Sequence, residues 1–174
     1  MTGMLRIIRR LSGLKADNKG VAAVEFALWT TAFFFSVMVA IDFGTFFLER
    51  GKLNGAVGAA AVSGFNTADN VNFGSMPGYV RSLTGEPATA VTISCNGTAN
   101  SCTNLNRTCA CLKSNGTYVS ASCGNTCTGT GVTAGSTAGY YMTINATNPF
   151  TPMILPNSAL ADTVLSQQAT VRLQ

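Results

Sequence analysis

The chain has 174 residues, which is enough for one compact domain and an accessory segment. It contains no histidine, so catalysis by a Ser/His or Cys/His pair and metal sites with imidazole ligands are excluded. Its formal net charge of +4 lies entirely in the first 20 residues, and residues 21–174 are neutral, so no basic surface is left for nucleic acid. Charged residues make up only 10% of the chain, against roughly 25% in soluble domains, which favours an exported or surface protein.

Residues 26–41 form an uncharged apolar run, and the window 21–48 adds only Glu25 and Asp42 near its ends. About 20 residues suffice to cross the hydrocarbon of a bilayer, so this window predicts a membrane-spanning helix in contact with lipid. The basic residues before it predict a cytoplasmic N-terminus and a C-terminal part across the membrane. Two alternatives are a core helix of a soluble protein and a secretory signal. The second would need a small-residue cleavage site, and the candidates around 58–61 lie far beyond the apolar run.

The junction between the basic leader and the apolar run has a specific form. The leader ends at Gly20, the run begins at Val21, and Glu25 is the fifth residue after the glycine. Glycine gives a protease room to approach the backbone. Glu25 lies one helical turn beyond Val21, and a carboxylate in hydrocarbon needs a positive partner.

This junction resembles the substrates of prepilin peptidases, membrane aspartic proteases that cut after such a glycine. The resemblance implies cleavage between Gly20 and Val21. In type IV pilin-like proteins the matching glutamate pairs with an N-terminal amine, so the resemblance implies an assembly role for Glu25, with Phe26 beside it.

The helix that follows is similar to the TadE-like family, minor pseudopilins of tight-adherence (Tad) pilus systems. The similarity covers residues 19–61 and rests on the stretches GVAAVEFALW, AIDFG and LERGKLNGAVGAAAVSG. The sequence departs from the family at Thr30 and Thr31, where proline is common. A looser similarity to TadE-like proteins continues through the cysteines to the last strand.

Beyond residue 48 we expect the helix to continue to about Gly64. Small residues recur there at every fourth position, namely Gly51, Gly55, Ala59 and Ser63. Such a stripe allows close approach of another element. Packing within the chain is the first interpretation and a contact between subunits the second.

The rest of the chain predicts a short helix followed by strands. Ser75-Met76-Pro77 is typical of a helix start, with the helix running to about Leu83. Alternating apolar residues predict strands over 89–95, 140–146 and 163–173, each with one buried face. We expect these strands to form an antiparallel sheet on the upper part of the long helix.

Six cysteines fall between residues 95 and 127, and an even number in a small translocated domain predicts disulfides. They are Cys95, Cys102, Cys109, Cys111, Cys123 and Cys127. We expect Cys109 and Cys111 to pair with Cys123 and Cys127, leaving Cys95 with Cys102. A zinc site built from the last four is the alternative, although their spacing does not match the usual pairs.

These expectations give three segments: a cytoplasmic leader at 1–20, a transmembrane and extended helix at 21–64, and a periplasmic disulfide-bonded head at 65–174. The fold class is α+β and pilin-like, with a small antiparallel β head. We expect no cofactor, no metal, no nucleic-acid partner and no enzymatic activity, because no catalytic group can be assembled from the residues present.

The predicted function is that of a minor pseudopilin processed by a prepilin peptidase. It would act in initiation or at the tip of a Tad or type IV-like pilus. The resemblance implies this because the major pilins of Tad systems are very short, and a head of this size would be bulky in a repeating shaft. Its expected partners are the peptidase, other pilin-like subunits and the Tad machinery of the bacterial inner membrane. The alternative is an unprocessed, single-span periplasmic binding protein.

Overall fold

The computed structural model describes residues 20–153 and 163–174. All of the expected leader except Gly20 therefore lies outside the described residues. The chain divides into two compact units, 1–43 and 44–174, which are described separately below.

The longest element is helix α2, Val21–Asn66, of 46 residues. It has no proline, and its first half consists mainly of apolar residues and alanine, which favours an uninterrupted helix. The helix ends two residues beyond the expected Gly64. The continuation past residue 48 is therefore confirmed, in spite of the glycines in the second half.

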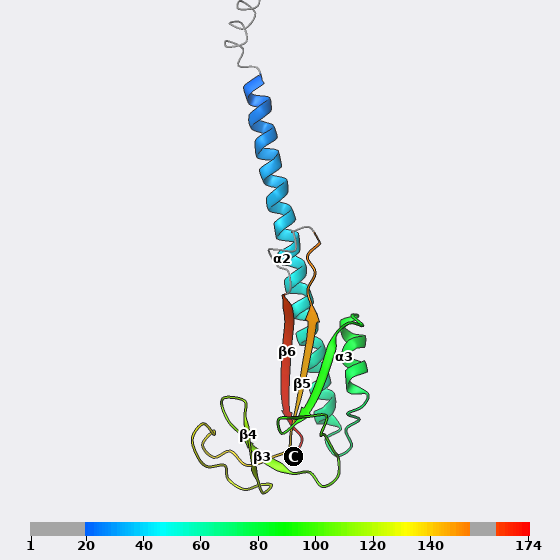
Figure 1. Ribbon diagram of the computed structural model, residues 1–174, viewed down its shortest axis with the longest axis vertical. Helices are drawn as coiled ribbons and strands as arrows, with labels where there is room; N and C mark the ends of the chain where they lie inside the picture. The colour runs from blue at the N-terminus through cyan, green and yellow to red at the C-terminus, as the bar shows by residue number, and fades with distance from the viewer. Residues whose placement is uncertain (1–19, 154–162) are drawn as a thin grey trace, which may run out of the picture. The chain divides into compact units, whose positions relative to one another are not determined.

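The second unit contains a four-stranded antiparallel sheet in the order β2-β1-β5-β6 (Figure 1). Its strands are β1 (Ala90–Cys95), β2 (Thr98–Ala99), β5 (Tyr141–Pro149) and β6 (Val164–Arg172). The central strand β5 pairs with β1 from Ala90 to Cys95 and with β6 along its whole length. The three strands predicted from alternating apolar residues are therefore confirmed.

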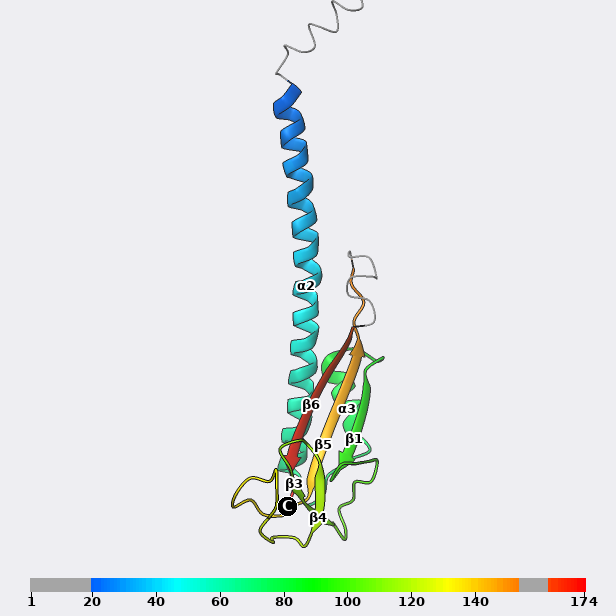
Figure 2. The same ribbon diagram turned by 60° about the vertical axis from the view of Figure 1, so that its left-hand side comes forward.

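One face of this sheet packs on residues 44–66 of α2 and on helix α3, Met76–Thr84 (Figures 1 and 2). The buried stripe of α2 repeats at helical spacing. Its members are Leu53, Ala56, Val57, Ala60 and Ala61, each at most 9% exposed. Met142, Ile144 and Ala146 of β5 lie against this stripe and are completely buried. Small residues on the helix let the sheet approach closely, so the core is thin and well packed.

Helix α3 has a clear stop signal at its C-terminus. Gly85 adopts the left-handed conformation (φ 73°), and its N–H donates to the carbonyl of Arg81 at 3.0 Å. Glycine tolerates this conformation without a steric penalty. Met76 and Val80 occupy the buried side of α3 and close the core next to β1.

A second, two-stranded sheet is formed by the segment between β2 and β5. It pairs β3 (Cys109–Leu112) with β4 (Tyr118–Ala121). Backbone hydrogen bonds between Ala110 and Gly139, 2.9 and 3.0 Å, connect it to the segment that enters β5. A small separate core forms there around Cys109, Cys111, Cys127 and Ala138. A long N-terminal apolar helix, an antiparallel sheet and disulfides together confirm the predicted α+β class.

Gly139 lies where the chain has no room for a side chain. A Cβ at this position would collide with Nε of Arg172 and with the backbone oxygen of Gln174. That oxygen accepts the N–H of Tyr140 at 3.1 Å, so the C-terminal residues cannot move without losing a hydrogen bond. We expect Gly139→Ala to lower the free energy of unfolding by about 1–3 kcal/mol, measured by denaturant titration of the purified protein.

The matched control is Gly55→Ala on the exposed side of α2, where no atom lies within 4 Å of the added Cβ. Alanine favours a helix over glycine by about 0.5–1 kcal/mol, so this variant should be slightly more stable than the wild type. Equal stability of the two variants would contradict the steric argument.

Candidate functional site

The junction expected to be processed lies at the start of α2. The helix begins at Val21, directly after Gly20, and both residues are exposed. No atom lies within 4 Å of a Cβ added at Gly20, so nothing in the described part of the chain obstructs this peptide bond. The junction is therefore accessible to a protease.

Glu25 and Phe26 lie just beyond the first turn of α2, and both side chains are exposed; Phe26 is 73% exposed. Asp42, the other carboxylate of residues 21–43, is fully buried. Within these residues Glu25 is therefore the one charge presented to the surroundings. An exposed carboxylate among apolar side chains can recruit a positive group when the segment is removed from water.

Residues 21–43 expose apolar side chains around the helix. Those more than half exposed are Val21, Val24, Phe26, Leu28, Trp29, Phe33, Phe34 and Phe35. The hydroxyls of Thr31 and Ser36 donate to the carbonyls of Ala27 and Ala32, at 2.8 and 2.9 Å. These polar groups are therefore satisfied without water, as membrane helices require. By length and composition this is the one described helix that can cross a membrane, and it suits a single-pass anchor.

Three of the four members of the small-residue stripe in the second half of α2 do not pack within the chain. Gly51, Gly55 and Ser63 are exposed, Ala59 is half-buried, and nothing lies within 4 Å of a Cβ added at either glycine. The first interpretation of this stripe was wrong. The sheet packs instead on a neighbouring stripe that includes Leu53 and Val57, because these larger side chains bury more apolar area.

All six cysteines are paired in the structure. Cys95 pairs with Cys102, Cys109 with Cys123, and Cys111 with Cys127, closing loops of 7, 14 and 16 residues in sequence. The four cysteines considered for zinc are therefore used in disulfides. Among the described residues no group of three or more potential metal ligands comes together. Such bridges contribute roughly 2–4 kcal/mol each to a head with so thin a core.

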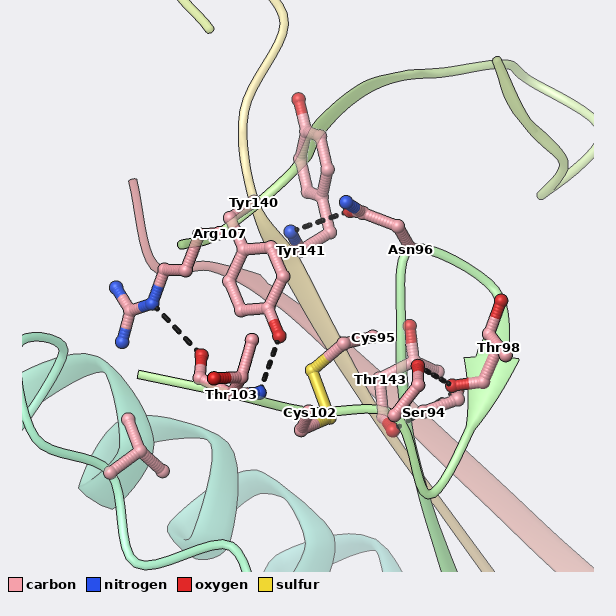
Figure 3. Close-up of a disulfide and its surroundings, with 12 residues drawn as sticks. Ser94, Cys95, Asn96, Thr98, Cys102, Thr103, Arg107, Tyr140, Tyr141 and Thr143 are labelled. Carbon is pink, nitrogen blue, oxygen red and sulfur yellow. Dashed lines mark hydrogen bonds between the residues drawn. A yellow bond between two sulfur atoms is a disulfide. The ribbon is translucent and has the colours of Figure 1, made fainter. Parts of the chain in front are cut away.

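The segment after the first disulfide is held to Tyr140 and to the loop that follows α2 by side chains that sequence reasoning missed (Figure 3). The guanidinium of Arg107 lies over the ring of Tyr140, 5.1 Å from its centroid, and Arg107 Nε donates to the carbonyl of Thr103 at 3.2 Å. The Tyr140 hydroxyl accepts the N–H of Thr103 at 2.9 Å. Asn104 bonds both backbone groups of Val71, 33 residues away. Local sequence carries no signal for such contacts.

A charged cluster lies where α2 meets the loop after α3. Glu49, Lys52 and Glu86 line one small hollow together with Asn148. Burial raises the pKa of the Glu49 carboxyl above its ordinary 4.5, and the negative charge of Glu86 raises it further, while Lys52 opposes both. Glu49 follows the apolar window and lies in the second unit. The cluster therefore belongs to the second unit.

The molecule thus belongs to a recognisable class: an α+β protein with a single N-terminal apolar helix that suits a membrane anchor, and a disulfide-bonded antiparallel head. Within this class, the model of the family described as TadE-like protein matches residues 20–62. The predicted resemblance to this family is confirmed over these residues. Comparisons with curated proteins and with solved structures give no match.

The raised pKa of Glu49 has a consequence for stability. The folded state binds this proton more tightly than the unfolded state, so stability falls as the pH rises from the ordinary pKa of 4.5 through the folded one. At about pH 7 the ionised Glu49 is therefore destabilising. We expect Glu49→Gln to raise the melting temperature at that pH, with the difference shrinking toward about pH 4.

The comparison variant is Asp69→Asn, which removes an exposed carboxylate of the same head. It should not raise the melting temperature at about pH 7 as Glu49→Gln does. If Glu49→Gln lowered the melting temperature at neutral pH, Glu49 would be stabilising in its ionised form and the argument would fail.

Proposed function

We propose that this chain is a minor pseudopilin, cut by a prepilin peptidase between Gly20 and Val21, that takes part in the initiation or tip of a Tad-type pilus. The observation that carries the proposal is the helix that begins directly after Gly20. It exposes apolar side chains around its first half and bears one exposed charge, Glu25. The TadE-like match over residues 20–62 covers this same segment.

Cleavage would create an amine at Val21, one helical turn before Glu25. A carboxylate at the centre of a membrane costs about 2.5–3.5 kcal/mol, which an adjacent ammonium group offsets. In an assembly of apolar helices, the Glu25 carboxylate of one subunit and the amine of another can satisfy each other. This pairing would select subunits that have lost their leader.

The head fits a location outside the cytoplasm. Disulfides persist in the periplasm and outside the cell and are rare in the reducing cytoplasm. The order of the chain, with basic residues first, then the apolar helix and then the head, supports a single pass through the inner membrane with the N-terminus inside.

The size and surface of the second unit support a minor component. The described residues of the second unit form two sheets, helix α3 and the second half of α2, which would be bulky in a repeating shaft of short subunits. The exposed stripe at Gly51, Gly55 and Ser63 suits the approach of another pilin-like helix, since small side chains permit close backbone contact. Partner subunits would thus contact α2 on the side opposite the sheet.

The first test is processing. We expect the wild type, expressed with a cognate prepilin peptidase, to begin at Val21, and Gly20→Leu to keep the uncut mass. The glycine has no neighbours, so its replacement should not disturb the fold. Intact mass and N-terminal sequencing of the membrane-extracted protein measure both forms.

Gly51→Leu is the matched control, because Gly51 is equally free of neighbours but lies far from the junction. It should be cut like the wild type. A wild-type protein that begins at Met1 with and without the peptidase would instead favour the anchored binding protein. A start near Ser63 would contradict both functions.

The second test is the role of Glu25. We expect Glu25→Leu to be cut normally but to fall at least about tenfold in the sheared pilus fraction, because the subunit amine then lacks its partner. Glu25→Asp should recover part of the signal, and Asp69→Asn in the head should behave as the wild type. Normal incorporation of Glu25→Leu would refute the pairing.

A further inference from the structure

The face of the main sheet that points away from the helices carries a regular array of neutral polar side chains. The register aligns three cross-strand rows, from β1 through β5 to β6. The rows are Ala90–Thr147–Ser166, Thr92–Asn145–Gln168 and Ser94–Thr143–Thr170. Every position except Ala90 offers a hydroxyl or an amide, and none is charged. Neighbouring side chains lie about 5 Å apart across the strands and about 7 Å apart along them.

Most of this array is open to solvent and carries no charge. Thr92, Asn145, Ser166, Gln168 and Thr170 are all exposed, and no helix of the described residues covers this face. Surfaces of soluble domains usually carry charge at roughly a quarter to a third of positions. The nearest charge along β6, Arg172, is held by the Gln174 carbonyl, the Thr137 hydroxyl and the Ala138 carbonyl.

One end of the array opens into a hollow of about 410 Å³ between the main sheet and the β3–β4 region. Tyr118 and Tyr141 are among its lining residues, and their ring centroids lie 5.9 Å apart with the ring planes tilted by 49°. Gln168 and Thr170 of β6 also line it, and Lys113 is the one charged residue of the lining. This volume lies within the range of small-molecule sites, roughly 300–1,000 Å³.

The hydroxyls of this region are already oriented by one another. The Tyr118 hydroxyl lies 3.0 Å from Oγ1 of Thr143, which lies 2.9 Å from Oγ1 of Thr170. Thr143 is only 6% exposed, so this chain is fixed within the fold. A hydroxyl has one donor and two acceptor sites, and the exposed Thr170 therefore keeps capacity for a ligand. The site is ordered before any ligand arrives, which reduces the entropic cost of binding.

We propose that this face binds a neutral glycan chain, with one sugar ring in the tyrosine-lined hollow and the next along the polar rows. A sugar offers apolar C–H faces to aromatic rings and hydroxyls to amide and hydroxyl groups, and this surface offers both. The lack of charge in the rows disfavours nucleic acid and anionic lipid, which need clusters of cations. The proposal is independent of whether the leader is removed.

The test is a titration of the full-length protein in a detergent without sugar groups. Chitotetraose, cellotetraose and maltotetraose serve as neutral probes, and binding is followed by calorimetry and by saturation-transfer NMR. We expect saturable binding of at least one probe by the wild type. We also expect Thr170→Val and Tyr141→Ala each to weaken it by about tenfold or more.

Thr98→Val is the matched control, because Thr98 is an exposed threonine on β2 of the same sheet but outside the three rows. It should bind as the wild type does. Thr170→Val preserves shape and strand preference, so the test stands even if Tyr141→Ala fails to fold. No binding of any probe at about 10 mM, or binding that neither variant weakens, overturns the proposal. Binding of polygalacturonate alone would assign the face to charged glycans and overturn it equally.

Discussion

Helix α2 has to satisfy two different surroundings along one continuous stretch of backbone. Its first half is apolar on all sides, so every orientation presents aromatic or aliphatic side chains. Its second half is apolar along one stripe, and that stripe is the support on which the sheet packs. In water the first half would expose phenylalanines at great cost, so it requires hydrocarbon or the helices of other subunits.

The head is built to be stable with little core and little charge. Alanines on α2 bring the sheet close to the helix, and only a few larger side chains such as Leu53 and Ile144 fill the space between. Three disulfides and many backbone and side-chain hydrogen bonds add to this limited apolar burial. Arg107 and Asn104 secure a loop without regular structure to the end of α2. Such a domain tolerates exposure outside the cell better than a large core with free thiols would.

The two faces of the sheet have different roles. The inner face is mainly apolar and fixes the sheet on α2 and α3, whereas the three central rows of the outer face are neutral and, apart from Ala90, polar. Folding alone does not require the outer rows to lack charge, because an exposed strand position accepts charged residues as readily as threonine. The tyrosine pair beside the ordered hydroxyls turns the outer face into a candidate surface for recognition.

The sequence by itself determined the features that depend on neighbours along the chain. The apolar run, the glycine junction, the spacing of Glu25 and the alternation in each strand are local, and physical chemistry links them directly to a membrane helix and to strands with one buried face. The match over residues 20–62 confirms the resemblance to the TadE-like family that the glycine junction and the apolar run indicate.

Tertiary structure alone decided which side of α2 packs on the sheet, since both the small stripe at Gly51 and the stripe at Leu53 have helical spacing. The larger side chains bury more apolar area, and the glycines stayed outside. Tertiary structure also decided that Tyr118 meets Tyr141, that Arg107 covers Tyr140 and that Glu49 lies near Glu86. These partners are brought together by strand register and chain reversal, which depend on the packing of the whole head and leave no mark in any short stretch of sequence.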